Sequence, residues 1–334
     1  MTIERTTLDP RPGVEIESDE ETAPVATKKK SSPRPATGSP AAPSSERLAV
    51  RKTYKLYVAG AFPRSESGRY DRAIAADGTV LANVCRASRK DVRDAVVAAR
   101  AAQPGWAGRT AYNRAQILYR MAEMLEGRGA QFEAELTAMG AAAPEAALEV
   151  AAAVDRLVYY AGWCDKVQQV FSSVNPVASS HFNFSMLEPM GVVTILAPEE
   201  SPLLGLCSVV APVIAGGNTC VALASRSRPL AAVTLAEVMH ASDLPGGVVN
   251  LLTGRRDELR ETLASHMDVD AVLVCGGDSE EAAAETAEIE RHAVHNLKRV
   301  RIERRTDWRD AAAESPYAIL DFQETKTTWH PIGS

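Results

Sequence analysis

The most constraining feature of this sequence is a series of short strand-like segments that alternate with helical segments after about residue 181. The five strand-like segments are VVTILA (192–197), TCVAL (219–223), VVNLL (248–252), AVLV (271–274) and LKRVRIE (297–303). Four segments with helical patterns separate them, at 202–214, 229–240, 255–266 and 279–294. Apolar strands without alternation are typical of strands covered on both faces. The pattern therefore predicts an α/β fold with an open, doubly wound, five-stranded parallel sheet and right-handed crossovers.

The sequence between about residues 54 and 190 is predicted to be mainly helical. YKLYVAGAF (54–62) alternates apolar and polar residues and turns at Gly60, which indicates an edge strand or a hairpin. Two amphipathic helices follow, the first with Ser88 as its N-cap and the second within 113–128. The second helix is expected to bury Ile117, Leu118, Met121 and Leu125. Alanine-rich helical sequence continues to about residue 171, and HFNFSMLEP (181–189) is predicted to be an extended arm.

Residues 1 to about 50 differ in composition from the rest of the chain. They contain no aromatic residue, seven of the 19 prolines and the run Lys28–Lys30. Such a segment buries too little apolar surface to offset the entropy that it loses on ordering. We therefore expect a disordered N-terminal tail, in which the basic run is either a contact site or simply solvated.

The composition argues against several classes of function. A net charge of −6 without a long basic face disfavours nucleic-acid binding. The five cysteines are scattered without a C-x-x-C pair or nearby histidines, so no metal site is predicted. No apolar stretch approaches the roughly 18 residues of a membrane span. An odd number of cysteines without a signal peptide indicates a reducing, cytoplasmic location.

Five longer segments follow one another in a specific order. They are EPMGVVTILAP, PLLGLCSVVAPVIAGGNTCV, SDLPGGVVNLLTG, LASHMDVDAV and KTTWHPIG. Together they resemble the aldehyde dehydrogenase family, over about residues 54 to 303 and the C-terminal end. The resemblance implies a cofactor domain on the five-stranded sheet, an oligomerisation arm near 181–189 and a separate catalytic domain.

The resemblance also implies that one domain is missing. The chain is much shorter than the family norm, and the difference falls between RIERRT (301–306) and ETKTTWHPIG (324–333). The nucleophile-bearing catalytic domain is therefore expected to be deleted, with the C-terminal tail kept. The expected organisation is a tail at 1–50, a degenerate cofactor domain with its arm at 51–303, and a linker with an oligomerisation tail at 304–334.

At the positions that match the family's catalytic residues, this chain has residues that cannot perform the same chemistry. Where family members have Pro-Trp-Asn-Phe-Pro, this chain has PEESP at 198–202. The family Asn donates an N–H to the oxyanion, a contribution of about 3 kcal/mol, and Glu200 has no donor when ionised. Glu303 is in register with the family's general base, but two arginines replace the Leu-Gly that follows, and no cysteine lies beyond Cys275. No catalytic residue is expected.

The positions that match the family's cofactor site also depart from its pattern. They are Glu199, Leu223, Arg226, Gly254, Gly276 and Gly277. Leu223 and Arg226 stand where family members have the Lys and Glu that hold the adenine ribose. Acids at 278, 280 and 281 follow the glycine pair; they suit a helix N-terminus and repel a pyrophosphate. No binding of NAD or NADP is expected.

A few residues have alternative interpretations. Cys275, at a strand end, is a conceivable replacement nucleophile, but neighbouring acids disfavour its thiolate. Cys207 and Cys220 are expected to lie in the core. Glu199 and Glu200 could hold a cation, but two acids without a third ligand are a weak metal signal. The favoured interpretation of the pair is a solvated turn left after loss of function.

These observations predict an inactive family member that assembles with full-length aldehyde dehydrogenase subunits, or with itself, as a structural or regulatory subunit. The arm and the tail are expected to present unpaired strand edges unless another polypeptide covers them. The expected interface residues are Phe182, Phe184, Met186, Trp329, His330 and Pro331. One alternative is an NAD(P)-dependent oxidoreductase with residual or altered activity on aldehydes. Another is a decayed gene product, which the regular core pattern disfavours.

Overall fold

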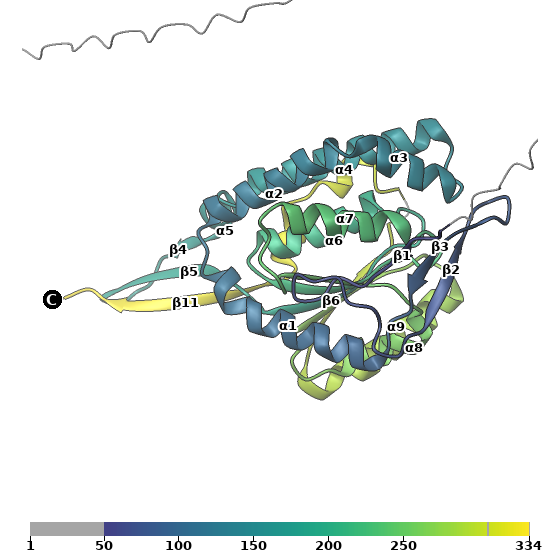
Figure 1. Cartoon of the computed structure of the whole chain (residues 1–334). Helices are drawn as coiled ribbons and strands as arrows, with labels where there is room; N and C mark the ends of the chain where they lie inside the picture. The colour runs from purple at the N-terminus through teal and green to yellow at the C-terminus, as the bar shows by residue number, and fades with distance from the viewer. Residues whose placement is uncertain (1–49, 306, 334) are drawn as a thin grey trace, which may run out of the picture. The chain divides into compact units, whose positions relative to one another are not determined.

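The computed structural model describes residues 50–305 and 307–333, which belong to one compact unit. The expected disorder of the N-terminal tail falls, apart from Val50, on residues outside this part of the chain. Figure 1 shows how the helices and strands are arranged. The helices are α1 (Arg89–Ala107), α2 (Ala111–Glu126), α3 (Gly129–Ala138), α4 (Ala143–Trp163), α5 (Val167–Phe171), α6 (Leu204–Ala215), α7 (Leu230–Ala241), α8 (Arg256–Ser265), α9 (Glu280–Ala293) and α10 (Tyr317–Leu320).

The central sheet is parallel and five-stranded, as predicted. Its strands are β6 (Val192–Leu196), β7 (Thr219–Leu223), β8 (Val249–Leu252), β9 (Ala271–Cys275) and β10 (Arg299–Glu303). They lie in the order β10-β9-β6-β7-β8, and every neighbouring pair is parallel. Every residue of β6, β7, β8 and β9 is buried, because helices cover both faces of the sheet.

The two faces of the sheet contact different helices. Helices α2, α3, α4, α6 and α7 lie on one face, and α1, α8 and α9 lie on the other (Figure 1). Side chains of successive strand residues alternate between the two cores: Val193 and Ile195 face α6, whereas Val192 and Leu196 face α1 and α8. From β6, the chain first adds β7 and β8 on one side through α6 and α7. It then returns through α8 and adds β9 and β10 on the other side of β6, with α9 between them.

Local signals account for the first helices. Ser88 accepts a hydrogen bond from the backbone N–H of Asp91, and the Asp91 carboxylate accepts one from the N–H of Ser88, which forms a capping box. The expected core residues of α2 are all buried: Ile117, Leu118, Met121 and Leu125. The hairpin expected at 54–62 is a tight turn, with Val58 bridged to Ala61 and Tyr57 bridged to Leu251 at the edge of the central sheet. A mixed sheet of β1 (Thr53–Tyr54), β3 (Val80–Cys85) and β2 (Tyr70–Ile74) lies beside it.

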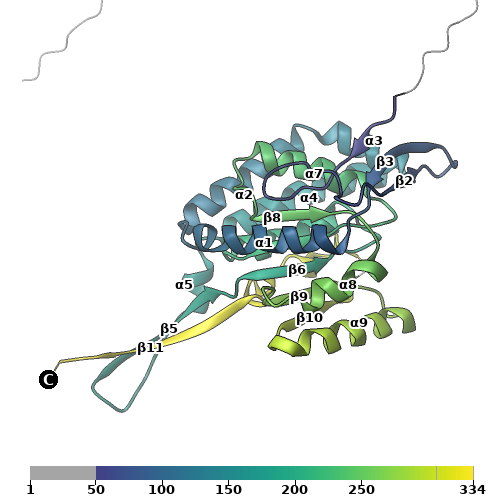
Figure 2. The same cartoon turned by 60° about the horizontal axis from the view of Figure 1, so that its bottom comes forward.

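The arm and the C-terminal tail form one antiparallel sheet within the chain. Strand β5 (His181–Pro189) lies between β4 (Ser173–Asn175) and β11 (Gln323–Pro331), and it pairs with β11 along its whole length. Figure 2 shows this sheet extending away from the central sheet. The expectation that arm and tail both present unpaired edges is therefore wrong for β5, because β11 supplies the hydrogen-bonding partners on one side. The outer edges of β4 and β11 have no strand partner among the residues that the structure describes.

Residues 304–322 connect β10 to β11, and we call this connection the strap. The strap runs over α4 and α6, and buries Trp308, Ala313, Ile319 and Phe322. Arg156 of α4, only 2% exposed, donates to the backbone carbonyl of Trp308 at 2.9 Å and to the hydroxyl of Ser208. The described residues contain no second parallel sheet and no catalytic domain between β10 and β11.

Candidate functional site

The carboxyl ends of β6 and β9 mark the point where the strand order of the sheet reverses. In open α/β sheets this crevice is the usual ligand site. Here the Arg256 guanidinium, from the first turn of α8, donates to the carbonyl of Cys275 at 2.9 Å and to the carbonyl of Ala197. The same guanidinium forms an ion pair with Glu285 at 3.2 Å, and its side chain is only 17% exposed. A side chain of the protein therefore occupies the crevice.

Glu199, in the turn after β6, is held by the loop after β7. Its carboxylate accepts hydrogen bonds from Ser225 Oγ at 2.9 Å, from the backbone N–H groups of Arg226 and Ser227 at 3.0 and 3.1 Å, and from Ser227 Oγ at 3.0 Å. Burial by itself would raise the pKa of Glu199, but these hydrogen bonds outweigh it and lower the pKa. The Glu199 carboxylate is thus held by specific hydrogen bonds, although its side chain is still 40% exposed. Its neighbour Glu200 is exposed.

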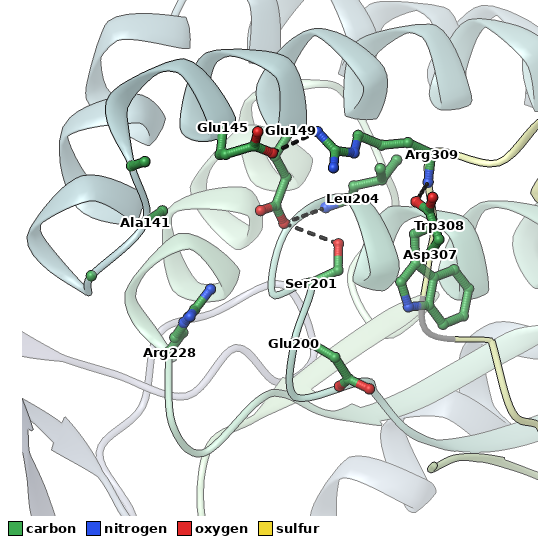
Figure 3. Close-up of a pocket in the computed structure, with 12 residues that line it drawn as sticks. Ala141, Glu145, Glu149, Glu200, Ser201, Leu204, Arg228, Asp307, Trp308 and Arg309 are labelled. Atoms are coloured by element: carbon green, nitrogen blue, oxygen red, sulfur yellow. Dashed lines mark hydrogen bonds and ion pairs between the residues drawn. The ribbon is translucent and has the colours of Figure 1, made fainter. Parts of the chain in front are cut away.

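A cavity of about 330 Å³ opens beside this turn, and we call it the Trp308 pocket (Figure 3). The turn between α3 and α4, the first turns of α4 and α6, the loop after β7 and the strap contribute to its wall. Its polar lining residues are Glu145, Glu149, Glu200, Ser201, Arg228, Asp307 and Arg309. The sequence analysis missed this pocket because half of its wall comes from segments that are distant in the sequence and have no motif.

All five cysteines are buried. Burial raises the pKa of Cys207 and of Cys164 to about 12, and it raises the pKa of Cys220 and Cys275 further. At Cys275, burial has the largest effect, the guanidinium of Arg256 opposes it, and the nearby carboxylates add to it. The expectation that Cys207 and Cys220 lie in the core is confirmed. Cys275 does not have the accessible thiolate that a nucleophile requires.

Comparisons with known proteins agree with the fold. The model of the aldehyde dehydrogenase family matches residues 62–304. The chain belongs to the aldehyde dehydrogenase family. Among curated proteins, the putative aldehyde dehydrogenase DhaS of Bacillus subtilis is 32% identical over 233 residues, which cover 68% of this chain and 46% of that protein. The cytosolic 10-formyltetrahydrofolate dehydrogenase of Xenopus tropicalis is 30% identical over 267 residues, which cover 77% of this chain and 29% of that protein.

Solved structures show the same relationship. An NAD⁺ complex of an aldehyde dehydrogenase from Bacillus cereus superposes with a TM-score of 0.71 at 27% identity, over 75% of this chain and 51% of that chain. PnpE from Pseudomonas sp. WBC-3 gives a TM-score of 0.71 at 27% identity, over 76% of this chain and 51% of that one. The chain thus spans about half the length of the solved family members that it matches, and less of the curated ones.

The residues that the resemblance places at the cofactor site differ in their surroundings. Leu223 is fully buried among the residues that face α1 and α8. Arg226 is exposed on the loop after β7. Gly254 packs so closely that a Cβ would lie 3.2 Å from Leu259 Cδ1, whereas Gly276 and Gly277 have ordinary space around them. Of these three glycines, Gly254 is the one whose neighbours leave too little space for a Cβ.

The helix that follows the glycine pair begins with acids, as expected. Ser279 is the N-cap of α9 and accepts a hydrogen bond from the N–H of Ala282, and Glu280 and Glu281 lie in the first turn. Hydrogen bonds from the backbone N–H of Glu281 and from Ser279 lower the pKa of Glu281. Negative charge at this end of a helix is favourable to the helix itself.

Glu200 and Glu303, which the sequence analysis compared with the family's catalytic residues, line different cavities. Glu303 ends β10, accepts a hydrogen bond from the N–H of Arg305 at 3.0 Å, and lines a second cavity of about 160 Å³. Trp308 lines both cavities. No cavity that the structure describes brings the two carboxylates together with a thiol.

The expected interface residues lie on the arm sheet, at the β5 and β11 strands. Phe182, Met186 and Trp329 are 43%, 46% and 57% exposed. Phe184 stacks against Phe182 with ring centroids 5.5 Å apart, and His330 and Pro331 are exposed. Within the described part of the chain, no cluster of three or more metal-ligating side chains is present, and no helix is long and apolar enough to cross a membrane.

Proposed function

We propose that this chain is a catalytically inactive member of the aldehyde dehydrogenase family that assembles with full-length aldehyde dehydrogenase subunits, or with itself, as a structural or regulatory subunit. The observation that carries the proposal is the position of the Arg256 guanidinium in the crevice between β6 and β9. A bound dinucleotide would have to displace hydrogen bonds to two backbone carbonyls and an ion pair with Glu285. Each carbonyl left without a donor in a buried site costs about 1–3 kcal/mol.

The surroundings of the crevice also disfavour a pyrophosphate. The Glu199 carboxylate takes up the backbone N–H groups of Arg226 and Ser227. The acids in the first turn of α9 add negative charge at the second helix that borders the crevice. An anion placed there would therefore find its donors already used and would be repelled by fixed carboxylates.

Among the residues that the structure describes, no cysteine is a candidate nucleophile for dehydrogenase chemistry. Every cysteine is buried, and burial keeps the thiols of Cys164, Cys207, Cys220 and Cys275 protonated at neutral pH. Glu200 offers no N–H donor for an oxyanion. Glu303, without a thiol beside it in its cavity, has nothing to activate.

The arm sheet supports the assembly part of the proposal. The outer edge of β11 has no strand partner among residues 50–305 and 307–333. Trp329 and Phe182 expose large aromatic surfaces on the same sheet. An open strand edge next to exposed aromatic side chains is the arrangement that strand addition uses, with the backbone giving affinity and the side chains giving specificity.

The experiment is to express the tagged chain in its own cell and to analyse what co-purifies by native mass spectrometry. We expect full-length aldehyde dehydrogenase subunits, or a second copy of this chain, in a defined ratio. Trp329→Ala should reduce the recovered partner about tenfold or more. Tyr70→Ala is the matched control, since Tyr70 is 55% exposed on β2, which belongs to a different sheet. A monomer that retains neither partner would refute the assembly.

The catalytic part is tested separately with the purified protein. NAD or NADP at millimolar concentration should not change its melting temperature, and a panel of aldehydes should give no NADH. Turnover that disappears in Glu303→Gln would instead establish a residual oxidoreductase activity.

A further inference from the structure

The Trp308 pocket contains polar groups that the rest of the protein leaves without partners. The indole Nε1–H of Trp308 has no hydrogen-bond acceptor among the described residues, although the side chain is only 4% exposed. Figure 3 shows this nitrogen turned toward the side of the pocket where Glu200 and Ser201 lie. A buried donor without an acceptor is costly, and such groups usually have a ligand or ordered water as partner.

The wall that carries this indole is held in place by specific contacts. Arg156 Nη2 donates a hydrogen bond to the backbone carbonyl oxygen of Trp308 at 2.9 Å and so fixes this part of the strap. The indole packs on the first turn of α6, where a Cβ on Gly205 would lie 3.4 Å from Trp308 Cε2. Specific contacts of the strap therefore fix this wall. Residues 307–309 lie beyond the part of the chain that the family model matches.

Several of the charges around the pocket are neutralised within the protein. Glu149 accepts hydrogen bonds from the backbone N–H groups of Leu203 and Leu204 at 3.0 and 3.2 Å, and so caps α6. Arg309 forms an ion pair with Glu145 at 2.6 Å. These groups hold the wall together and are not available to a ligand.

Three charges remain without an ion pair, one positive and two negative. The side chains of Glu200 and Arg228 make no ion pair or hydrogen bond with any residue in the described ranges, 50–305 and 307–333. Figure 3 shows Arg228 on the opposite side of the pocket from Trp308, with Glu200 between them at the lower edge. Asp307 is the third charge, because its carboxylate accepts the backbone N–H of Arg309 at 2.9 Å but forms no ion pair within the described ranges. The pocket therefore offers one guanidinium, two carboxylates and one buried N–H donor.

We propose that the Trp308 pocket binds a small zwitterion that carries a carboxylate and a primary ammonium group, such as a short amino acid. The carboxylate pairs with Arg228, the ammonium group pairs with Glu200, and a ligand oxygen accepts the indole N–H. A volume of about 330 Å³ is enough for such a molecule and too small for a dinucleotide. This inference depends neither on the proposed assembly nor on whether the crevice between β6 and β9 binds a dinucleotide.

The experiment is a calorimetric and fluorescence titration of the full chain with glycine, 3-aminopropanoate, 4-aminobutanoate and 5-aminopentanoate. Acetate and ethylamine are the singly charged controls. We expect at least one zwitterion to bind with a dissociation constant below about 1 mM and to change the emission of Trp308, while each control binds at least tenfold more weakly. Trp308→Phe should abolish the change in emission.

Substitutions that remove the charge of Arg228 or Glu200 distinguish binding in this pocket from unspecific binding. Arg228→Gln and Glu200→Gln should each weaken binding about tenfold or more, with melting temperatures like that of the parent protein because both side chains lack internal partners. Arg226→Gln, at an exposed position on the same loop, is the matched control and should leave the affinity unchanged. Absence of binding by every zwitterion up to about 10 mM, or equal affinity in Arg228→Gln and Glu200→Gln, would overturn the proposal.

Discussion

Arg256 Nη1 lies 2.9 Å from the carbonyl oxygen of Cys275, so a residue from the start of α8 closes the carboxyl end of β9. The same guanidinium reaches the carbonyl of Ala197 at the end of the neighbouring strand. One side chain therefore joins β6 and β9, the two parallel strands between which the strand order reverses. The crevice that a doubly wound sheet usually offers to a ligand is stabilised here by the protein's own charge.

Arg256→Ala should destabilise the protein by about 2 kcal/mol, because two backbone carbonyls lose their donor and Glu285 loses one of its partners. Chemical denaturation measures this change. Arg226→Ala, which removes an exposed guanidinium from the loop nearby, should change the free energy of unfolding by less than about 0.5 kcal/mol. Equal stability of both variants would show that Arg256 does not stabilise the crevice.

Glu199→Gln should reduce the pH dependence of stability below neutral pH. The pKa of Glu199 is lowered in the folded protein, so its contribution is present above the unfolded-state pKa and is lost as the pH falls through the folded-state pKa. Unfolding curves between pH 3 and pH 7 should therefore converge for the parent and the variant at the acid end. Glu126→Gln, at an exposed position on α2, should follow the parent at every pH. A constant difference across the range would contradict the linkage.

Arg156→Leu should loosen the strap, because the Trp308 carbonyl and the Ser208 hydroxyl lose their donor and Glu314 loses its partner at 3.6 Å. We expect a loss of about 3 kcal/mol and rapid cleavage by trypsin near Arg309. Arg120→Ala breaks an exposed ion pair with Asp243 and serves as control, with an expected loss below about 1 kcal/mol. Resistance of the Arg156 variant to trypsin would show that other contacts hold the strap.

The five cysteines should be unreactive in the folded protein, because all are buried. Ellman's reagent at pH 8 should modify none of them within minutes, and all five should react after denaturation in urea. Rapid modification of Cys275, identified by mass spectrometry, would mean that its thiol is accessible and would reopen its role as a nucleophile.

Removal of the chain from Lys326 onward should cause aggregation as well as loss of assembly. Lys326 to Pro331 pair with His181 to Met186 of β5. Their removal leaves the distal half of β5 without a partner on that side, and an open strand edge favours association. Light scattering measures the outcome; Trp329→Ala, which keeps the backbone ladder, should stay soluble.

The sequence by itself determined the secondary structure and the fold class. The four fully buried strands are continuous apolar runs, and such runs are stable only between two layers of helices. The capping box at Ser88 and the acidic start of α9 are local signals, because a cap involves residues that are three apart in the chain.

The tertiary structure decided what these positions contact. Glu199 accepts hydrogen bonds from groups 26 to 28 residues away, and Arg256 donates to carbonyls 19 and 59 residues away. No local pattern predicts such partners. The pairing of β5 with β11 also depends on two segments that are far apart in the sequence. Arg156 contacts the strap, which forms one wall of the Trp308 pocket, from a position 152 residues earlier in the chain. Side-chain direction and long-range packing follow from the free energy of the whole fold, so residue types and spacing alone do not specify them.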